Sequence, residues 1–156
     1  MPETKVQARD VESGQDRFVT RDLPVAYLML RATMGLHMIA HGGVRLPILR
    51  AFAAETREDF LGVTLLGLPL FPGWLVTLIA YAIPPAEIVI GLLLTVGLKT
   101  RLASTTGSVL FLVMMFGTVA RMNFATAHIM WFYVMVFVVL GALSFADRYS
   151  VDRVWE

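Results

Sequence analysis

The sequence contains no cysteine. This absence excludes disulfides, thiolate zinc sites, cysteine-ligated iron–sulfur clusters, covalently attached c-type haem and CxxC redox motifs. Charged residues are scarce, at 16% of the 156 residues, against about 25% in an average soluble domain. The net charge of +1 gives no electrostatic reason to expect a nucleic-acid partner. The chain also lacks GxGxxG, P-loop and nucleophile-elbow motifs, so its motifs do not support a soluble enzyme.

Apolar side chains are abundant instead. They make up 57% of the residues, against about 45–50% in soluble domains, and the mean hydropathy is +0.70. Four long apolar stretches cover residues 23–44, 74–98, 102–120 and 127–145. Each is close to or above the length of about 20 residues that crosses a bilayer core. Short connections join the last three stretches and make them antiparallel neighbours. The sequence therefore predicts an all-α integral membrane protein in contact with the lipid bilayer, with four transmembrane helices in an up-down bundle.

Polar segments surround this membrane domain of residues 23–146. Residues 1–22 form a polar N-terminal tail with no signal-peptide pattern, and residues 147–156 form a C-terminal tail. In the first loop, Pro47–Gly62 is a candidate interfacial helix. Eight Lys and Arg residues fall on the side of the two termini and the Lys99–Arg101 turn, and four fall on the other side. The positive-inside rule then predicts that both termini are cytoplasmic.

Two ionisable residues, Arg31 and Glu87, fall inside the predicted spans. Each needs a reason to be there, because a charge at a helix centre costs about 2.5–3.5 kcal/mol on insertion scales. Counted from the nearest polar edges at about 1.5 Å per residue, their depths differ by about 6 Å, which an arginine stem can bridge. We expect them to face the bundle interior and to pair. Two interpretations stay open: a structural ion pair, or a catalytic pair that handles protons or ligand.

Pro84 and Pro85 lie just before Glu87. They remove two backbone donors and predict a break in the second helix near mid-membrane. A half-helix that began there would hold Glu87 in its first turn, where the helix dipole stabilises a carboxylate.

A polar cluster is expected near the opposite membrane face from the termini. His37 and His41 share one helix face at i, i+4 spacing. Residues predicted at a similar level are His128, Arg121 and Asn123, with Arg45 nearby. The cluster fits a quinone headgroup, which needs a few hydrogen-bond donors at the membrane edge and an apolar channel behind them. Bis-histidine ligation of haem b is the less favoured alternative. No other metal site is expected.

Three segments together resemble the DoxX/DoxD-type small membrane proteins, which are related to the membrane subunit of thiosulfate:quinone oxidoreductase. They are LMLRATMGLHMIAHGGVR at 28–45, GLPLFPGWLVTLIAYAIPPAEIVIGLLLTVGLKTRLAS at 67–104 and ADRYSVDRVW at 146–155. The first is similar to the family's opening helix, which contains an arginine, here Arg31, and ends in His-Gly before a basic residue, here Arg45. The second carries the family-like glutamate, Glu87. The extra histidine, His37, and the double proline depart from the pattern.

The resemblance implies a protein of the bacterial or archaeal cytoplasmic membrane that serves a redox system beside membrane or peripheral partner subunits. We expect a membrane subunit of a quinone-linked oxidoreductase, fed with electrons by a partner or by a small sulfur-containing donor. The alternative is a non-catalytic accessory or anchor subunit of a larger electron-transfer or photosynthetic complex. A transporter ranks third, because four helices are few for alternating access. Catalysis by the chain itself and homo-oligomerisation stay open.

Overall fold

The computed structural model of this chain describes residues 18–61, 64–65, 68–69, 71–120 and 122–151. Most of the predicted N-terminal tail (1–17) and the last residues of the predicted C-terminal tail (152–156) lie outside the described residues. The elements are a π-helical turn η1 (Phe18–Asp22), α2 (Leu23–Arg45), α3 (Leu49–Leu61), the antiparallel two-residue strands β1 (Thr64–Leu65) and β2 (Leu68–Pro69), α4 (Gly73–Val96), α5 (Thr100–Ala120), α6 (Phe124–Ala142) and a 3-10 turn η2 (Ser144–Ala146).

The predicted four-helix membrane architecture is confirmed. Among the described residues, α2, α4, α5 and α6 are long and apolar enough to cross a membrane. Their ends lie within three residues of the predicted spans. The first loop contains the expected extra helix, α3. Large apolar side chains such as Met29, Leu78, Leu102 and Phe132 are exposed around the bundle, which suits helices in contact with lipid.

Local sequence explains where these helices begin and end. Pro24 lies in the first turn of α2. Backbone N–H groups in a first turn have no acceptor within the helix, so proline costs no hydrogen bond there. Gly97 ends α4 in the left-handed conformation, with φ of 77°, and its N–H donates to the carbonyl of Leu93. Asn123 caps α6, because its side chain accepts a hydrogen bond of 3.2 Å from the backbone N–H of Thr126.

The four long helices form two tightly packed antiparallel pairs. In the first pair, α2 and α4 approach backbone to backbone at glycines. A Cβ added at Gly35 would lie 2.8 Å from the carbonyl oxygen of Gly91, and one at Gly42 would lie 2.6 Å from that of Pro84. Small residues allow this approach between membrane helices. In the second pair, the ring of Phe137 on α6 packs over Gly107 of α5.

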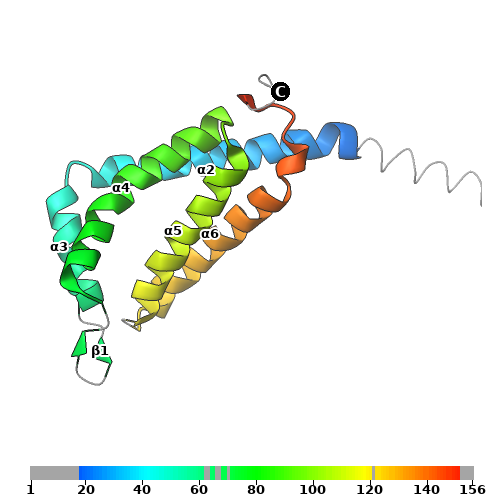
Figure 1. Cartoon of the computed structure of the whole chain (residues 1–156). Coiled ribbons are helices and arrows are strands. Elements are labelled where there is room, and N and C mark those ends of the chain that lie inside the picture. Colours follow the sequence, from blue (N-terminus) through cyan, green and yellow to red (C-terminus); the bar gives the residue numbers. More distant parts are fainter. Residues whose placement is uncertain (1–17, 62–63, 66–67, 70, 121, 152–156) are drawn as a thin grey trace, which may run out of the picture.

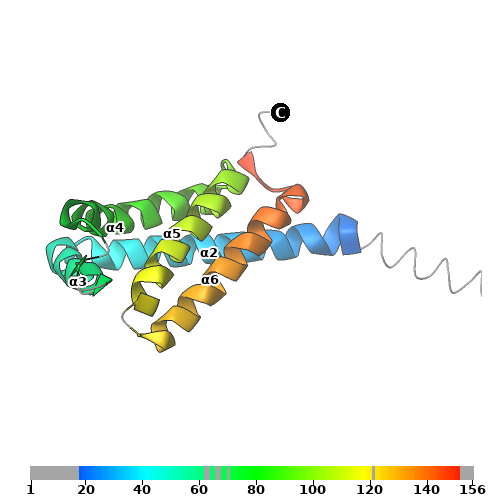
Figure 2. The same cartoon turned by 60° about the horizontal axis from the view of Figure 1, so that its bottom comes forward.

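The two pairs meet at one end and diverge at the other (Figures 1 and 2). They meet where α4 passes into α5, which we call the closed end, and diverge toward α3, which we call the open end (Figure 1). The apolar core between the pairs is built from buried side chains of α2, α4, α5 and α6: Tyr27, Met34, Met38, Ile90, Leu94, Phe111, Val134, Phe137 and Leu140.

The predicted break at the double proline is wrong. α4 is a single helix from Gly73 to Val96, with Pro84 and Pro85 inside it, and Figure 1 shows it bending along its length. Proline bends a membrane helix without ending it when neighbouring helices hold both halves. Here Pro84 is buried against Gly42 of α2. Glu87 therefore lies in the interior of a continuous helix, and no half-helix N-terminus faces it.

The close approach of α2 and α4 can be tested with one methyl group. We expect Gly91→Ala to lower the free energy of unfolding by about 1–3 kcal/mol through overpacking, because the new Cβ would lie 2.6 Å from the carbonyl oxygen of Gly35. Gly43→Ala is the matched control, since a Cβ there meets nothing within 4 Å. Unfolding in detergent micelles measures both variants, and an equal effect of the two would contradict the packing described here.

Candidate functional site

Arg31 is the centre of a buried polar network at the closed end. Its side chain is 1% exposed, and its Nη1 donates to Oδ2 of Asp147 at 3.1 Å. Its Nη2 donates to the carbonyl oxygen of Tyr149 at 3.2 Å. Thr100 donates its hydroxyl to the same Oδ2 of Asp147 at 2.9 Å. The network thus ties α2 to the start of α5 and to the segment that follows α6.

Two further contacts complete the closed end. The Arg31 guanidinium occupies the space beside Gly97, and a Cβ at residue 97 would collide with this guanidinium. Tyr27 of α2 donates its hydroxyl to the carbonyl oxygen of Leu140 on α6 at 3.0 Å. The two helix pairs are therefore joined here by directional bonds as well as by apolar packing.

The predicted pairing of Arg31 with Glu87 is wrong. Gly35 faces Gly91 and Gly42 faces Pro84, so the antiparallel register brings Arg31 level with Thr95. Glu87 lies eight residues away from that level, about 12 Å along the helix. The counter-charge comes instead from Asp147, which is 6% exposed because η2 and the residues after it fold back over the bundle end.

Glu87 forms its ion pair with Arg45, the last residue of α2. Glu87 is fully buried, and its Oε1 accepts from Nη1 of Arg45. Its second oxygen, Oε2, has no hydrogen-bond partner among the described residues. Arg45 is 22% exposed, and its guanidinium carbon lies 5.0 Å from the ring centroid of Phe52 on α3, a cation–π contact. By the same register Arg45 lies level with Tyr81, six residues or about 9 Å from Glu87. The long arginine side chain spans that offset, and sequence spacing alone does not identify the pair.

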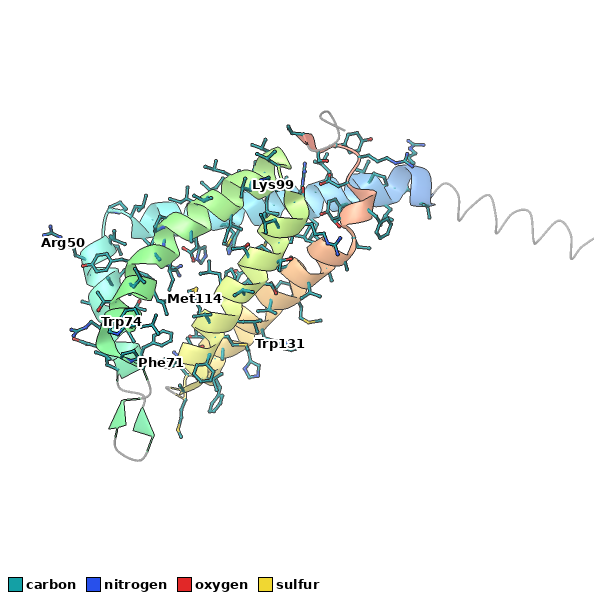
Figure 3. The ribbon with its side chains drawn as sticks, viewed as in Figure 1. Arg50, Phe71, Trp74, Lys99, Met114 and Trp131 are labelled. Atoms are coloured by element: carbon teal, nitrogen blue, oxygen red, sulfur yellow. The ribbon has the colours of Figure 1, made fainter. Side chains whose placement is uncertain are left out.

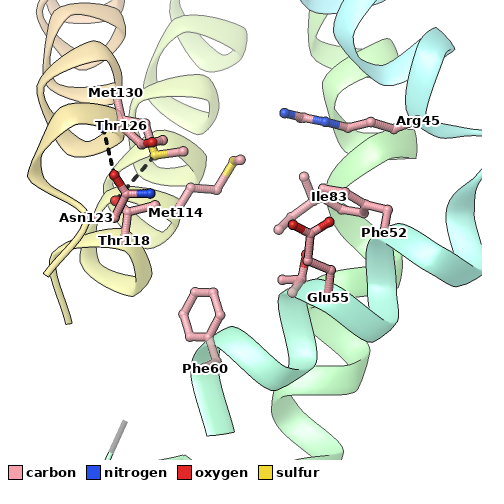
Figure 4. Close-up of a pocket in the computed structure, with 11 residues that line it drawn as sticks. Arg45, Phe52, Glu55, Phe60, Ile83, Met114, Thr118, Asn123, Thr126 and Met130 are labelled. Atoms are coloured by element: carbon pink, nitrogen blue, oxygen red, sulfur yellow. Dashed lines mark hydrogen bonds between the residues drawn. The ribbon is translucent and has the colours of Figure 1, made fainter. Parts of the chain in front are cut away.

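A cleft of about 250 Å³ lies between the helix pairs at the open end. One wall consists of side chains from α2, α3 and α4: Arg45, Phe52, Glu55, Thr56, Phe60 and Ile83. The other wall comes from α5, α6 and the turn between them: Met114, Thr118, Asn123, Thr126 and Met130. Figure 4 shows the Arg45 guanidinium pointing into the gap between these walls. Met114 lies on the side of α5 that faces α4, whereas Trp131 points away from the bundle (Figure 3).

The histidines do not line this cleft. The ring of His37 lies 4.3 Å from that of His41, as their i, i+4 spacing predicts, and it stacks on Tyr133 of α6 at 5.0 Å. Nε2 of His37 is buried and has no hydrogen-bond partner in the described part of the chain. His128 is exposed.

The expected single polar cluster is therefore divided. Asn123 shares the cleft with Arg45, while the cleft lining contains none of the three histidines. Arg121, predicted in the same cluster, lies outside the described residues. The division arises because His37 stacks on Tyr133 in the middle of α6, whereas Asn123 lies at the start of that helix, where the helix pairs have diverged. Among the described residues, no group of three or more His, Cys, Asp or Glu side chains could hold a metal ion.

Comparisons of this chain with protein-family models, with curated proteins and with solved structures find no match. The DoxX/DoxD resemblance thus stays a prediction from the sequence segments that carry it.

A double-mutant cycle tests the partner of Arg31. Removing one member of a buried ion pair costs about 3–5 kcal/mol, so Arg31→Gln and Asp147→Asn should each lower the free energy of unfolding strongly. The double variant should lose much less than the sum of the two. The exposed charge of Arg21 is the control, and Arg21→Gln should stay within about 0.5 kcal/mol. A cycle that couples Arg31 to Glu87, with none to Asp147, would contradict this network.

Proposed function

We propose that this chain is the membrane subunit of a quinone-linked oxidoreductase system and that the cleft at the open end holds the quinone headgroup. The observation that carries the proposal is the composition of the cleft. A cation and a carboxylate, Arg45 and Glu55, lie on one wall and face uncharged polar side chains of the other wall across the gap, and apolar side chains lie among them. Such a site suits a ligand with a small polar head and an apolar body.

The donors in the cleft fit quinone carbonyl oxygens. A guanidinium has five N–H donors, and Arg45 gives one to Glu87. The others can serve a ligand in the cleft. Asn123 accepts from the N–H of Thr126 through its side-chain oxygen, which leaves its NH₂ group to donate. Phe52 and Phe60 of α3 add apolar surface to the cleft, and the ring of Phe60 also packs against Gly117 of α5.

A bound quinone supplies a two-electron, two-proton acceptor, reduced by electrons from a partner subunit or from a small sulfur-containing donor. The contribution of this chain is electrostatic and positional. Arg45 stabilises negative charge at the polar head, because its own charge is fixed beside the cleft. Glu87 holds Arg45 in place through Oε1, and its unpartnered Oε2 is a position at which a proton can be held.

The Lys and Arg distribution favours cytoplasmic termini, as in a bacterial or archaeal cytoplasmic membrane. The open end, with α3 and the cleft, then faces the opposite side. A peripheral or membrane partner that delivers electrons would have to bring them to within reach of this end.

A second candidate function is supported by the ion pairs. Among the described residues, the ionic side chains of the bundle interior are Arg31, Asp147, Glu87 and Arg45, and each of them pairs within the chain. Charged residues that pair with each other inside the chain can act solely by stabilising the fold. This favours a non-catalytic accessory or anchor subunit of a larger electron-transfer or photosynthetic complex.

Quinone titration separates these two functions. In lipid nanodiscs, we expect a short-chain quinone to quench the tryptophan fluorescence of the protein in a saturable way. Arg45→Gln should weaken that binding at least tenfold, or about 1.4 kcal/mol, and Asn123→Ala should weaken it less. Arg50→Gln removes the same charge from the same end of the molecule, outside the cleft, and should leave the affinity unchanged.

Folding is checked on every variant by its unfolding midpoint. A folded Arg45→Gln variant that binds quinone as the parent does would overturn the quinone proposal and favour the accessory function. Loss of binding in His37→Ala or His41→Ala, without loss in Asn123→Ala, would move the site to the histidine stack.

A further inference from the structure

A second groove lies at the closed end, between α5 and α6, far from the proposed quinone cleft. Its volume is about 330 Å³. The α5 wall consists of Arg101, Ser104, Thr105 and Ser108. These positions follow i, i+3, i+4 and i+7 spacing, so they share one face of the helix. A membrane helix thus presents a guanidinium and three hydroxyls to one groove.

One of these hydroxyls has no partner. Ser104 is fully buried, and its Oγ makes no hydrogen bond to any described residue. Thr105 donates its hydroxyl to the carbonyl oxygen of Arg101 at 2.9 Å, and its oxygen stays able to accept. A buried hydroxyl without a partner is uncommon, because desolvation is then uncompensated. A polar ligand in the groove would supply the missing partner.

The α6 wall makes the groove amphipathic. Gly141 and Ala142 line the groove with little side-chain volume, and a Cβ added at Gly141 would make only an ordinary contact of 3.8 Å with Cβ of Ser104. Phe137 and Val138, about one turn deeper, are apolar. Arg101 is the second residue of α5 and is exposed, so it lies at the membrane surface end of the helix. The groove therefore runs from a cation at the surface, past hydroxyls, to apolar side chains within the membrane.

We propose that this groove binds the headgroup phosphate of an anionic phospholipid. Arginine binds phosphate oxygens in a bidentate way, and the hydroxyls of Ser104 and Ser108 add neutral donors. Basic pockets between transmembrane helices are typical sites for anionic lipid headgroups. Lys99, two residues before Arg101, adds a second exposed cation at the same end.

Charge complementarity favours a lipid over a helix of a second copy. The small residues of the groove would admit a helix, but a docked apolar helix would cover Arg101 without offering a counter-charge. A phospholipid supplies the anion at the mouth and the acyl chain alongside Val138. The groove lies at the opposite end of the molecule from the quinone cleft, so the lipid proposal does not depend on the proposed function.

The test is retention of lipid by the whole protein. The chain is reconstituted in nanodiscs containing equal amounts of phosphatidylglycerol and phosphatidylcholine, then released and analysed by native mass spectrometry. We expect one phosphatidylglycerol to be retained with at least tenfold preference. Arg101→Gln should abolish that preference, and the double variant Ser104→Ala, Ser108→Ala should reduce it several-fold. Arg21→Gln, a matched loss of one exposed charge, should leave the preference unchanged.

Three outcomes would overturn the proposal. Equal losses of lipid preference in Arg101→Gln and Arg21→Gln would indicate that the positive charge of the protein attracts anionic lipid in general, without a specific site in the groove. Displacement of the lipid by millimolar inorganic phosphate would indicate a site for the free anion. The groove would be assigned to a second copy by two results together: the protein forms a dimer that Gly141→Leu dissociates, and Arg101→Gln leaves lipid retention unchanged. Thermal unfolding of each variant confirms that it is folded before lipid retention is compared.

Discussion

A charge inside a membrane bundle must have a partner, and the ion pair of Arg31 with Asp147 satisfies that constraint at the closed end. Its consequences extend beyond the two side chains. Asp147 can reach Arg31 only because the chain after α6 folds back, and Thr100 shares the same carboxylate oxygen. One interaction therefore fixes the N-terminal half of α2, the start of α5 and the path of the return segment. It also joins the two helix pairs to each other.

The second ion pair acts differently, and the contrast explains the shape of the molecule. Arg45 and Glu87 belong to α2 and α4, the two members of one helix pair. This interaction therefore strengthens that pair without drawing α5 and α6 toward it. With directional bonds between the pairs at one end and none described at the cleft, the pairs diverge, and polar side chains of both come to face one gap. The same arrangement that satisfies buried charges thus creates the cleft to which we assign the quinone headgroup.

Sequence patterns predicted the four spans and the helix in the first loop, because long apolar runs and capping residues act locally. They failed where the answer depends on how helices pack. Depth counted from polar edges does not identify the partner of Arg31, because the glycine contacts of Gly35 and Gly42 determine the register. The break at Pro84 was predicted from lost backbone donors, but packing on α2 keeps α4 continuous. The histidines and Asn123 share a predicted depth yet face different neighbours, and helix rotation of this kind is not visible in one sequence.

The most direct test of the central claim maps where a quinone lies on the protein. A photoreactive azido-quinone is irradiated with the chain in nanodiscs, and the labelled peptides are identified by mass spectrometry. The account predicts saturable labelling on both walls of the cleft, in the α3 segment around Phe60 and around Met114 or Met130, with competition by unmodified quinone. Labelling confined to lipid-facing residues, or to the stack of His37 and Tyr133, would contradict it.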